Sequence, residues 1–208
     1  MQTTRLTKES EYAMARPVEF DEDTVLTNAM EQFWLEGYEA SSVQKLLDAT
    51  DINRGTLYNS FGDKDTFFKS CVEKYNDVLK ADITATLGND RLGDWKAIEA
   101  YFETAIIAAP NKQRALGCLL VNSVCESINW DRDMQKVVKN SFGILRKAMA
   151  TRVKALEKSR QFKRGLKADQ AVEILMNLYN GLRVSARSGK GPKQLTELVS
   201  FTLGSLKK

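Results

Sequence analysis

Residues 51–65 read DINRGTLYNSFGDKD, and this stretch decides the fold. A helix that serves only for packing has little use for an arginine, a threonine, a tyrosine and an asparagine within about two turns. A glycine at position 62 then ends the helix, and an Asp-Lys-Asp sequence starts another at once. The stretch therefore predicts a short helix whose polar face serves for binding.

Two helices are predicted before this one. Residues 20–38 carry apolar side chains at spacings of three and four, and residues 42–50 follow with a serine as the cap. A break at 51–53 leads into the short third helix at 54–60. Two helices of about eight residues, joined by a three- or four-residue turn and braced by an earlier helix, form a helix-turn-helix.

The remaining chain also reads as helices. Only three prolines and twelve glycines occur in 208 residues, which favours long helices over a many-turned β protein. We therefore expect an all-α fold of about nine helices. The further helices are expected from about 63 or 65 to 87 and at 94–109, 116–128, 131–159, 168–188 and 192–206.

A short helix after such a turn suits the major groove of DNA, about 12 Å wide, where base edges are exposed. Arg54 can pair with a guanine and Asn53 with an adenine, while Gly55 allows close approach of the backbone. Tyr58 and Asn59 suit phosphate oxygens, which fix register without reading sequence. The full set of predicted DNA-binding residues is Ser42, Gln44, Asn53, Arg54, Gly55, Thr56, Tyr58, Asn59 and Lys64.

Residues 20–68, FDEDTVLTNAMEQFWLEGYEASSVQKLLDATDINRGTLYNSFGDKDTFF, resemble the DNA-binding region of the TetR/AcrR family of bacterial repressors. The resemblance implies an all-α homodimer that binds a palindromic operator in double-stranded DNA. It also implies that a small-molecule effector entering the C-terminal domain releases the DNA. The spacings that carry it are those of Gly37, Gly55, Tyr58, Phe61 and Lys64.

The sequence departs from the family pattern in two places. Thr50-Asp51 stands where an alanine-glycine pair is common, and the basic arm often found before the first helix is nearly absent. Residues 1–66 hold six basic and thirteen acidic residues, a net charge of −7, whereas the whole chain carries +4. We therefore expect modest non-specific affinity for DNA, with specific binding dependent on charges placed at the phosphates.

Composition disfavours several other functions. Histidine is absent, which removes the commonest general base and the commonest metal ligand, so we expect no enzyme, no metal site and no cofactor. The three cysteines lack metal-ligand spacing and suit a reducing cytosol. No apolar run approaches the roughly 18 residues that cross a bilayer, and the N-terminus lacks the apolar centre of a signal peptide. These features predict a cytoplasmic protein without a membrane partner.

We expect residues 1–66 to form the helix-turn-helix DNA-binding domain and residues 67–208 a domain for ligand binding and dimerisation. Aromatic side chains with a few polar groups suit a small organic ligand. The predicted ligand-binding residues are Trp95, Phe102, Ile106, Cys118, Leu119, Asn122, Trp130, Phe142 and Tyr179. The last two helices are expected to pair with their copies in a four-helix bundle. The predicted dimer interface is Ile174, Leu175, Leu178, Gly181, Leu182, Leu195, Leu198, Val199 and Thr202.

Two alternatives stay open. The segment GCLLVNSVCES at 117–127 resembles that of a TetR-like subgroup with a frequent Gly-Cys-Leu motif, and Cys118 or Cys125 can be either a sensor of oxidants and electrophiles or plain core. Seven residues of helix separate them by about 10 Å of rise, too far for a disulfide. The other alternative is a small-molecule carrier that kept the fold and lost DNA binding. The intact Asn53, Arg54, Thr56, Tyr58 and Lys64 count against the carrier.

Overall fold

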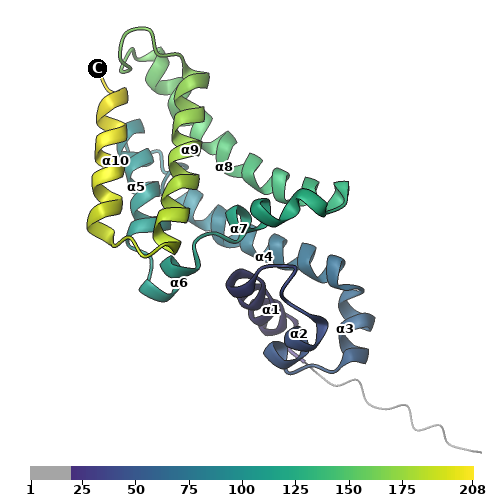
Figure 1. Ribbon diagram of the computed structural model, residues 1–208. Helices are drawn as coiled ribbons and strands as arrows, with labels where there is room; N and C mark the ends of the chain where they lie inside the picture. The colour runs from purple at the N-terminus through teal and green to yellow at the C-terminus, as the bar shows by residue number, and fades with distance from the viewer. Residues whose placement is uncertain (1–19) are drawn as a thin grey trace, which may run out of the picture.

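The computed structural model describes residues 20–208, so the place of the basic arm, before the first helix, and part of the predicted domain 1–66 lie outside it. The described chain is all-α, with ten α-helices and two short helical segments of other types (Figure 1). The helices are α1 (Glu22–Glu36), α2 (Val43–Thr50), α3 (Arg54–Phe61), α4 (Lys64–Ala85), α5 (Asp94–Phe102), α6 (Asn111–Leu116), α7 (Leu119–Glu126), α8 (Arg132–Lys158), α9 (Ala168–Arg187) and α10 (Pro192–Leu206).

Side-chain caps explain why the first four helices begin where they do. Asp21, Ser42, Asn53 and Asp63 each precede a helix, and the side-chain oxygen of each accepts a hydrogen bond from a backbone N–H of the first turn. Such caps satisfy donors that the helix itself leaves free and contribute about 1 kcal/mol each. The start of each of these four helices is thus set by the capping residue directly before it.

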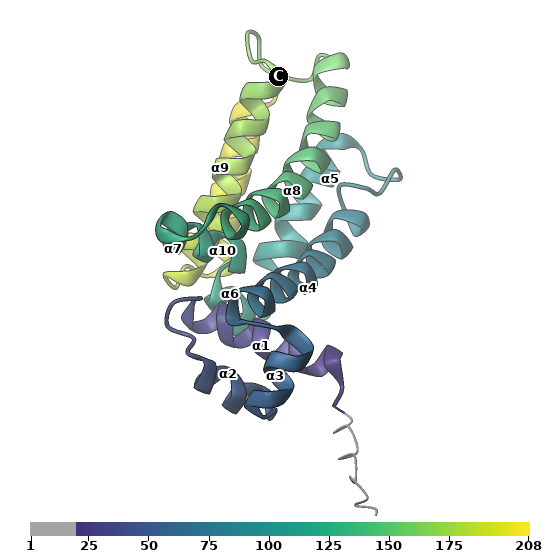
Figure 2. The ribbon, with the colours of Figure 1, turned by 90° about the vertical axis from the view of Figure 1, so that its right-hand side faces the viewer.

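The helices α1, α2 and α3 gather at one end of the protein, and α5, α8, α9 and α10 form most of the other (Figures 1 and 2). The helix α4 extends from the first group into the second and packs against both α1 and α8. Its buried face includes Phe67, Phe68, Cys71 and Tyr75. The predicted domain boundary after residue 66 therefore falls in the first turn of a helix that both groups share.

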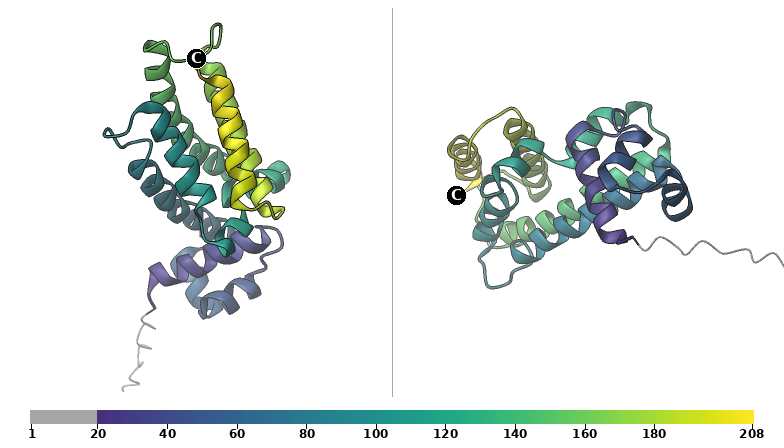
Figure 3. Two further views of the ribbon diagram at one scale, coloured as in Figure 1. Left: turned by 90° about the vertical axis from the view of Figure 1, so that its left-hand side faces the viewer. Right: turned by 90° about the horizontal axis from the view of Figure 1, so that it is seen from below.

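The segment before α9 is hydrogen-bonded to the end of α10. The backbone N–H of Lys163 donates to the carbonyl of Leu206 at 3.0 Å, and that of Lys208 donates to Gln161 at 3.0 Å. These bonds join the connection between α8 and α9 to the end of α10, which lies close to it in the views of Figure 3. The helices α9 and α10 are thus held as an antiparallel pair.

The helices expected at 94–109 and 116–128 require correction. The first changes from α-helix to π-helix at Glu103–Ile107, and the short α6 then follows Pro110. Gly117, with φ +75°, ends α6, so the second helix begins only at Leu119. An added Cβ at Gly117 would lie 3.3 Å from the carbonyl oxygen of Arg183, which explains a glycine here in terms of close approach to α9.

Within residues 20–208, no helix is both long enough and apolar enough to span a membrane.

Candidate functional site

The helix α3 presents one face to the core and the other to solvent. Leu57 and Phe61 are buried, whereas Arg54, Tyr58 and Asn59 are exposed. No acidic residue occurs from position 52 to 62, so the exposed face of α3 is free of negative side chains. The geometry leaves an arginine, a phenol and an amide available to a partner along one helix.

Three of the predicted DNA-binding side chains are already engaged within the chain. The Oδ1 atom of Asn53 accepts from the backbone N–H of Thr56 at 2.8 Å, and the Oγ of Ser42 accepts from that of Lys45 at 3.3 Å. Gln44 donates to Asp48 at 2.8 Å. A bidentate pair with adenine would need the Oδ1 that Asn53 uses as a cap, so we reassign Asn53 to holding the start of α3.

Two backbone positions shape the turn before α3. Asp51, with φ 55°, caps the end of α2 in the left-handed region, which is where the family pattern commonly has glycine. Aspartate tolerates this conformation better than most residues, so the departure noted in the sequence keeps the turn. At Gly55 an added Cβ would lie 3.2 Å from Oδ1 of Asn53, a tight contact with the capping atom. Gly55 thus has a role within the chain, whatever it permits outside it.

Lys64 lies in a small cluster at the start of α4. Its Nζ is 4.2 Å from the centroid of the Tyr38 ring, and the Tyr38 hydroxyl donates to Asp65. Partial burial lowers the pKa of the Lys64 ammonium, and the charges of Glu39, Asp65 and Glu126 oppose that change. The predicted phosphate contact therefore requires the side chain to leave the Tyr38 ring.

The loop after α1 contacts the region between α7 and α8. The backbone N–H of Glu39 donates to Oε2 of Glu126 at 3.1 Å, and Nε1 of Trp130 donates to Oε1 of Glu39 at 3.1 Å. The rings of Tyr38 and Trp130 pack edge to face, with centroids 5.0 Å apart. Trp130, predicted as a ligand contact, instead fastens the helix-turn-helix to the rest of the chain.

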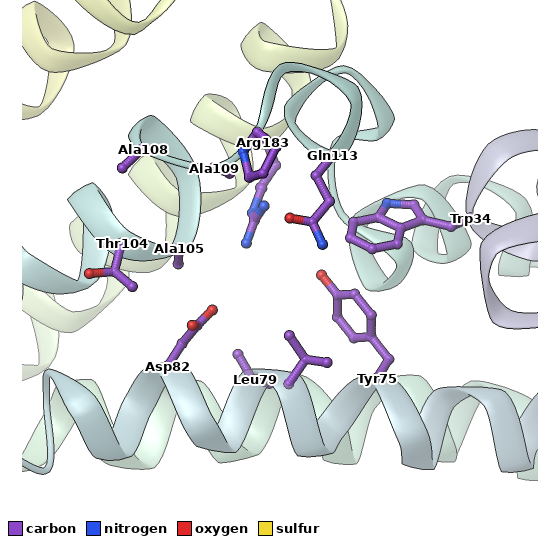
Figure 4. Close-up of a pocket in the computed structure, with 12 residues that line it drawn as sticks. Trp34, Tyr75, Leu79, Asp82, Thr104, Ala105, Ala108, Ala109, Gln113 and Arg183 are labelled. Atoms are coloured by element: carbon purple, nitrogen blue, oxygen red, sulfur yellow. The ribbon is translucent and has the colours of Figure 1, made fainter. Parts of the chain in front are cut away.

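A pocket of about 340 Å³ lies where α1, α4, the π-helical segment, α6 and α9 meet (Figure 4). Trp34, Tyr75, Leu79 and Arg183 are buried, and the exposed Val78, Thr104 and Gln113 form the rim. In Figure 4 the side chains of Arg183, Gln113, Tyr75 and Asp82 point from different walls towards the same space. The volume suits a small organic molecule. The complete lining is Trp34, Tyr75, Val78, Leu79, Asp82, Thr104, Ala105, Ala108, Ala109, Pro110, Gln113 and Arg183.

The nine predicted ligand-binding residues are not among those that line this pocket, and the prediction is corrected. Phe102, Ile106 and Leu119 belong to the buried core, to which the half-buried Phe142 also packs. Trp95 lies against Phe162, with ring centroids 5.6 Å apart. The half-buried Asn122 donates to the carbonyl of Leu116 at 3.0 Å and lines a different surface depression. The aromatic and apolar side chains chosen for their helical spacing thus pack in the hydrophobic core and do not line this pocket.

Two of the predicted ligand-binding residues contact side chains that line the pocket. Cys118 contacts Tyr75, and Tyr179 packs against Arg183. The Tyr75 hydroxyl donates to Sγ of Cys118 at 3.3 Å, and the Tyr179 hydroxyl lies 3.3 Å from the same atom. Cys118 is buried and precedes α7, whereas Cys125 is exposed. The expectation that both cysteines lie within one helix is therefore wrong, because α7 begins only after Cys118.

The α9 and α10 pair carries two kinds of predicted interface residues. Leu175, Leu182, Leu195 and Val199 are buried inside the chain, so their assignment to a dimer interface is corrected. Ile174, Leu198 and Gly181 are exposed, and Leu178 and Thr202 are half-buried. The stripe chosen from sequence was the inner face. Phe201, with 80% of its surface exposed, was missed, and Val184 is also exposed.

Comparison with known proteins shows which regulators the chain is similar to. Residues 25–71 match the sequence model described as bacterial regulatory proteins, tetR family. HTH-type transcriptional repressor ComR of Escherichia coli is 26% identical over 189 residues, which cover 90% of each chain. An uncharacterized HTH-type transcriptional regulator of Bacillus subtilis, YezE, is 35% identical over 124 residues, 59% of this chain and 63% of that protein. The chain is thus similar to TetR family regulators, over the helix-turn-helix in the family model and over most of its length in ComR.

Solved structures of TetR family proteins share the fold over nearly the whole chain. The regulatory protein TetR from Rhodobacter sphaeroides superposes with a TM-score of 0.79 at 15% identity, over 88% of this chain and 97% of that one. A cysteine mutant of the TetR family regulator CifR, in complex with a 26-base-pair double-strand operator DNA, gives a TM-score of 0.77 at 20% identity, over 92% and 100%. The all-α prediction is thus confirmed.

The sequence analysis did not find the pocket, although one signal for it was present. Arg183 interrupts the buried stripe of α9 between Leu182 and Ala186, four residues after Tyr179. A single arginine on an otherwise apolar face requires a partner or a function, since an unpaired buried charge is costly. Trp34, Tyr75 and Asp82 carried no such signal, because they join Arg183 only through tertiary packing.

Proposed function

We propose that this regulator is a homodimeric repressor that binds a palindromic operator through α2 and α3 and releases it when a small molecule fills the pocket at Trp34 and Arg183. The observation that carries the DNA-binding part is the exposed face of α3, with Arg54, Tyr58 and Asn59 on a helix free of acids. The match of residues 25–71 to the tetR family model and the similarity in fold to CifR, solved in complex with operator DNA, support the same assignment.

Within this proposal, Arg54 reads a base and the surrounding residues hold phosphates. Arg54 stands at the first position of α3 and is exposed, so its guanidinium is free to pair with a guanine. Ser42, Tyr58 and Asn59 place hydroxyl and amide groups at the exposed edges of α2 and α3. Phosphate contacts of this kind set the register of the helix in the groove.

The proposed dimer uses the outer face of α9 and α10. Ile174, Leu198 and Phe201 are exposed apolar side chains on that face, and Gly181 has open space where a side chain would stand. Apolar patches of this kind mark interfaces, and two copies of one face pack isologously across a twofold axis. The resulting four-helix bundle would set the separation of the two α3 helices and thus of the half-sites.

Selection of bound sequences from random duplex DNA at moderate salt tests the proposal. Enrichment of a palindrome with two half-sites about one helical turn apart is the expected result. Enrichment of a single, non-repeated half-site would remove the dimer from the proposal. If no sequence is enriched, the acidic N-terminal balance outweighs the contacts of α3 and the DNA-binding assignment fails.

A second candidate is a repressor of the same fold that senses oxidants or electrophiles through Cys118. Its support is the pair of hydroxyls of Tyr75 and Tyr179, each 3.3 Å from Sγ. The substitution Cys118→Ser decides between the candidates: loss of the response to hydrogen peroxide with DNA binding intact supports sensing, and an unchanged response refutes it.

A further inference from the structure

Arg183 is a buried cation without an acidic partner in residues 20–208. Only 7% of its surface is exposed, and no carboxylate pairs with it in the described part of the chain. Its Nη1 donates to the carbonyl of Gly117 at 3.3 Å, and its Nε is buried with no partner. The guanidinium lies 5.2 Å from the centroid of the Tyr179 ring. A neutral carbonyl and a ring leave most of the cost of burying this charge uncompensated.

Arg152, also buried among residues 20–208, shows how the charge of an arginine is compensated inside this protein. Arg152, 9% exposed, donates to the carbonyls of Leu87 at 2.7 Å and Asn89 at 2.9 Å, and pairs with Asp94 at 3.2 Å. Each nitrogen of its guanidinium thus has a partner, and these bonds tie α8 to the segment before α5 and to the first residue of α5. Because Arg183 lacks such partners and borders a pocket, its free donors are available to a ligand.

A second unpartnered donor borders the same pocket. The Nε1 of Trp34, a residue only 6% exposed, is buried without a hydrogen-bond partner. The Trp34 ring packs edge to face on Tyr75, with centroids 5.1 Å apart, which fixes its place in the wall. These two N–H donors, which no protein acceptor meets, select an acceptor group on the ligand, and a guanidinium selects a carboxylate most strongly.

The other walls define the rest of the ligand. Leu79, Ala105 and Pro110 supply apolar surface, part of it from the π-helical segment, a feature that is frequent at functional sites. Asp82 lines the pocket on α4 and faces the same space as Arg183 in Figure 4. Desolvation raises the pKa of Asp82, and the charge of Arg183 opposes this rise. A carboxyl in this position disfavours a second negative charge on the ligand.

We propose that the pocket binds a small monocarboxylate, with its acid group on Arg183 and Trp34 and its apolar body against Leu79 and Ala105. This inference rests on the proposed function and names the chemical class of its effector. Trp34 belongs to α1 of the helix-turn-helix, whereas Arg183 belongs to α9. A ligand that bridges them acts directly on the position of α1 relative to the body, and it shifts DNA affinity by its differential affinity for the two arrangements.

Direct binding without DNA tests the ligand class. The probes are benzoate, phenylacetate and hexanoate, each compared by calorimetry with its primary amide, which has nearly the same shape and no charge. We expect at least one acid to bind, and to bind about tenfold or more tightly than its amide. Absence of binding by all three acids, or equal binding of acid and amide, overturns the proposal. This comparison uses the unmodified protein and does not depend on any variant folding.

Variants then place the acid group. Arg183→Gln is expected to weaken acid binding at least about tenfold, and Trp34→Phe, which keeps an aromatic wall and removes only Nε1, about two- to tenfold. The matched control is Arg187→Gln, one turn further along α9 and outside the pocket lining, which leaves binding unchanged. If Trp34→Phe and a folded Arg183→Gln both bind the acid as the parent does, the assignment is refuted.

Failure of the inference and failure of the proposed function give different results. If random-DNA selection yields a palindrome while no acid binds, the ligand class is wrong and the repressor stands. If an acid binds and no DNA is enriched, the effector role is refuted together with the proposed function. With both in hand, the acid should release the selected duplex at concentrations near its dissociation constant, and an acid that binds without changing DNA affinity is no effector.

Discussion

Asn53 separates two roles that a helix-turn-helix residue can have, and its cap bond makes the separation measurable. Its Oδ1 accepts the N–H of Thr56 at 2.8 Å, so it satisfies one of the free donors at the start of α3. Replacing such a cap by alanine costs about 1 kcal/mol, whereas serine caps nearly as well as asparagine. We therefore expect Asn53→Ala to lower the free energy of unfolding by about 1 kcal/mol, and Asn53→Ser to leave it nearly unchanged.

The assay combines thermal unfolding with binding to the selected operator. For a protein of this size, a loss of about 1 kcal/mol lowers Tm by roughly 2–4 °C. In the unfolding measurement Asn59→Ala is the matched control, because Asn59 is exposed on the same helix and is not its cap. If Asn53 only caps, Asn53→Ser keeps both affinity and base preference. A serine variant of parental stability that loses about 1–3 kcal/mol at one base position would refute this reasoning and return Asn53 to base reading.

Three further predictions test the remaining assignments. Arg54→Ala should cost about 1–3 kcal/mol of specific affinity and relax one operator position, as measured with operators changed at single base pairs; an unchanged preference removes Arg54 as a reader. Lys64→Ala should weaken binding to all sequences and lower the slope of log K against log salt by about 1; an unchanged slope means that its ammonium stays on the Tyr38 ring. Phe201→Glu should yield monomers in sedimentation, while Ile128→Glu, 84% exposed outside α9 and α10, keeps the dimer; a dimeric Phe201→Glu protein would move the interface elsewhere.

Local signals in the sequence predicted the helix-turn-helix well. Ser42, Asn53 and Asp63 are caps, and Gly37 and Gly62 have φ values of 89° and 75°, so starts and stops are written into single residues. Each such signal acts within one turn of chain and needs no tertiary contact. The same reasoning failed between residues 103 and 119, where the chain changes to a π-helix and Gly117 turns close to the backbone of α9.

Predictions about helix faces failed for a related reason. Periodicity finds the apolar stripe of a helix but does not say whether that stripe meets its own chain or a partner. On α9, Leu175 and Leu182 are buried against their own chain. The exposed apolar side chains of this helix include Ile174 and Val184. On α10, Phe201 lies outside the stripe of Leu195, Val199 and Leu203, so an exposed aromatic side chain was the better indicator of an outer face.

The pocket shows why a ligand site of this kind is hidden in sequence. Trp34, Tyr75 and Arg183 are each unremarkable within their own helices, and their meeting depends on how α1, α4 and α9 cross. The physical mark of the site is a lack of hydrogen-bond acceptors. The buried N–H groups of Trp34 and Arg183 have no acceptor, whereas the Nε of the buried Arg152 donates to the carbonyl of Leu87. The free protein leaves these two donors desolvated and unpaired, so a ligand that accepts their hydrogen bonds gains binding free energy. Since the two donors come from α1 and α9, a ligand that binds both couples occupancy of the pocket to the position of the helix-turn-helix.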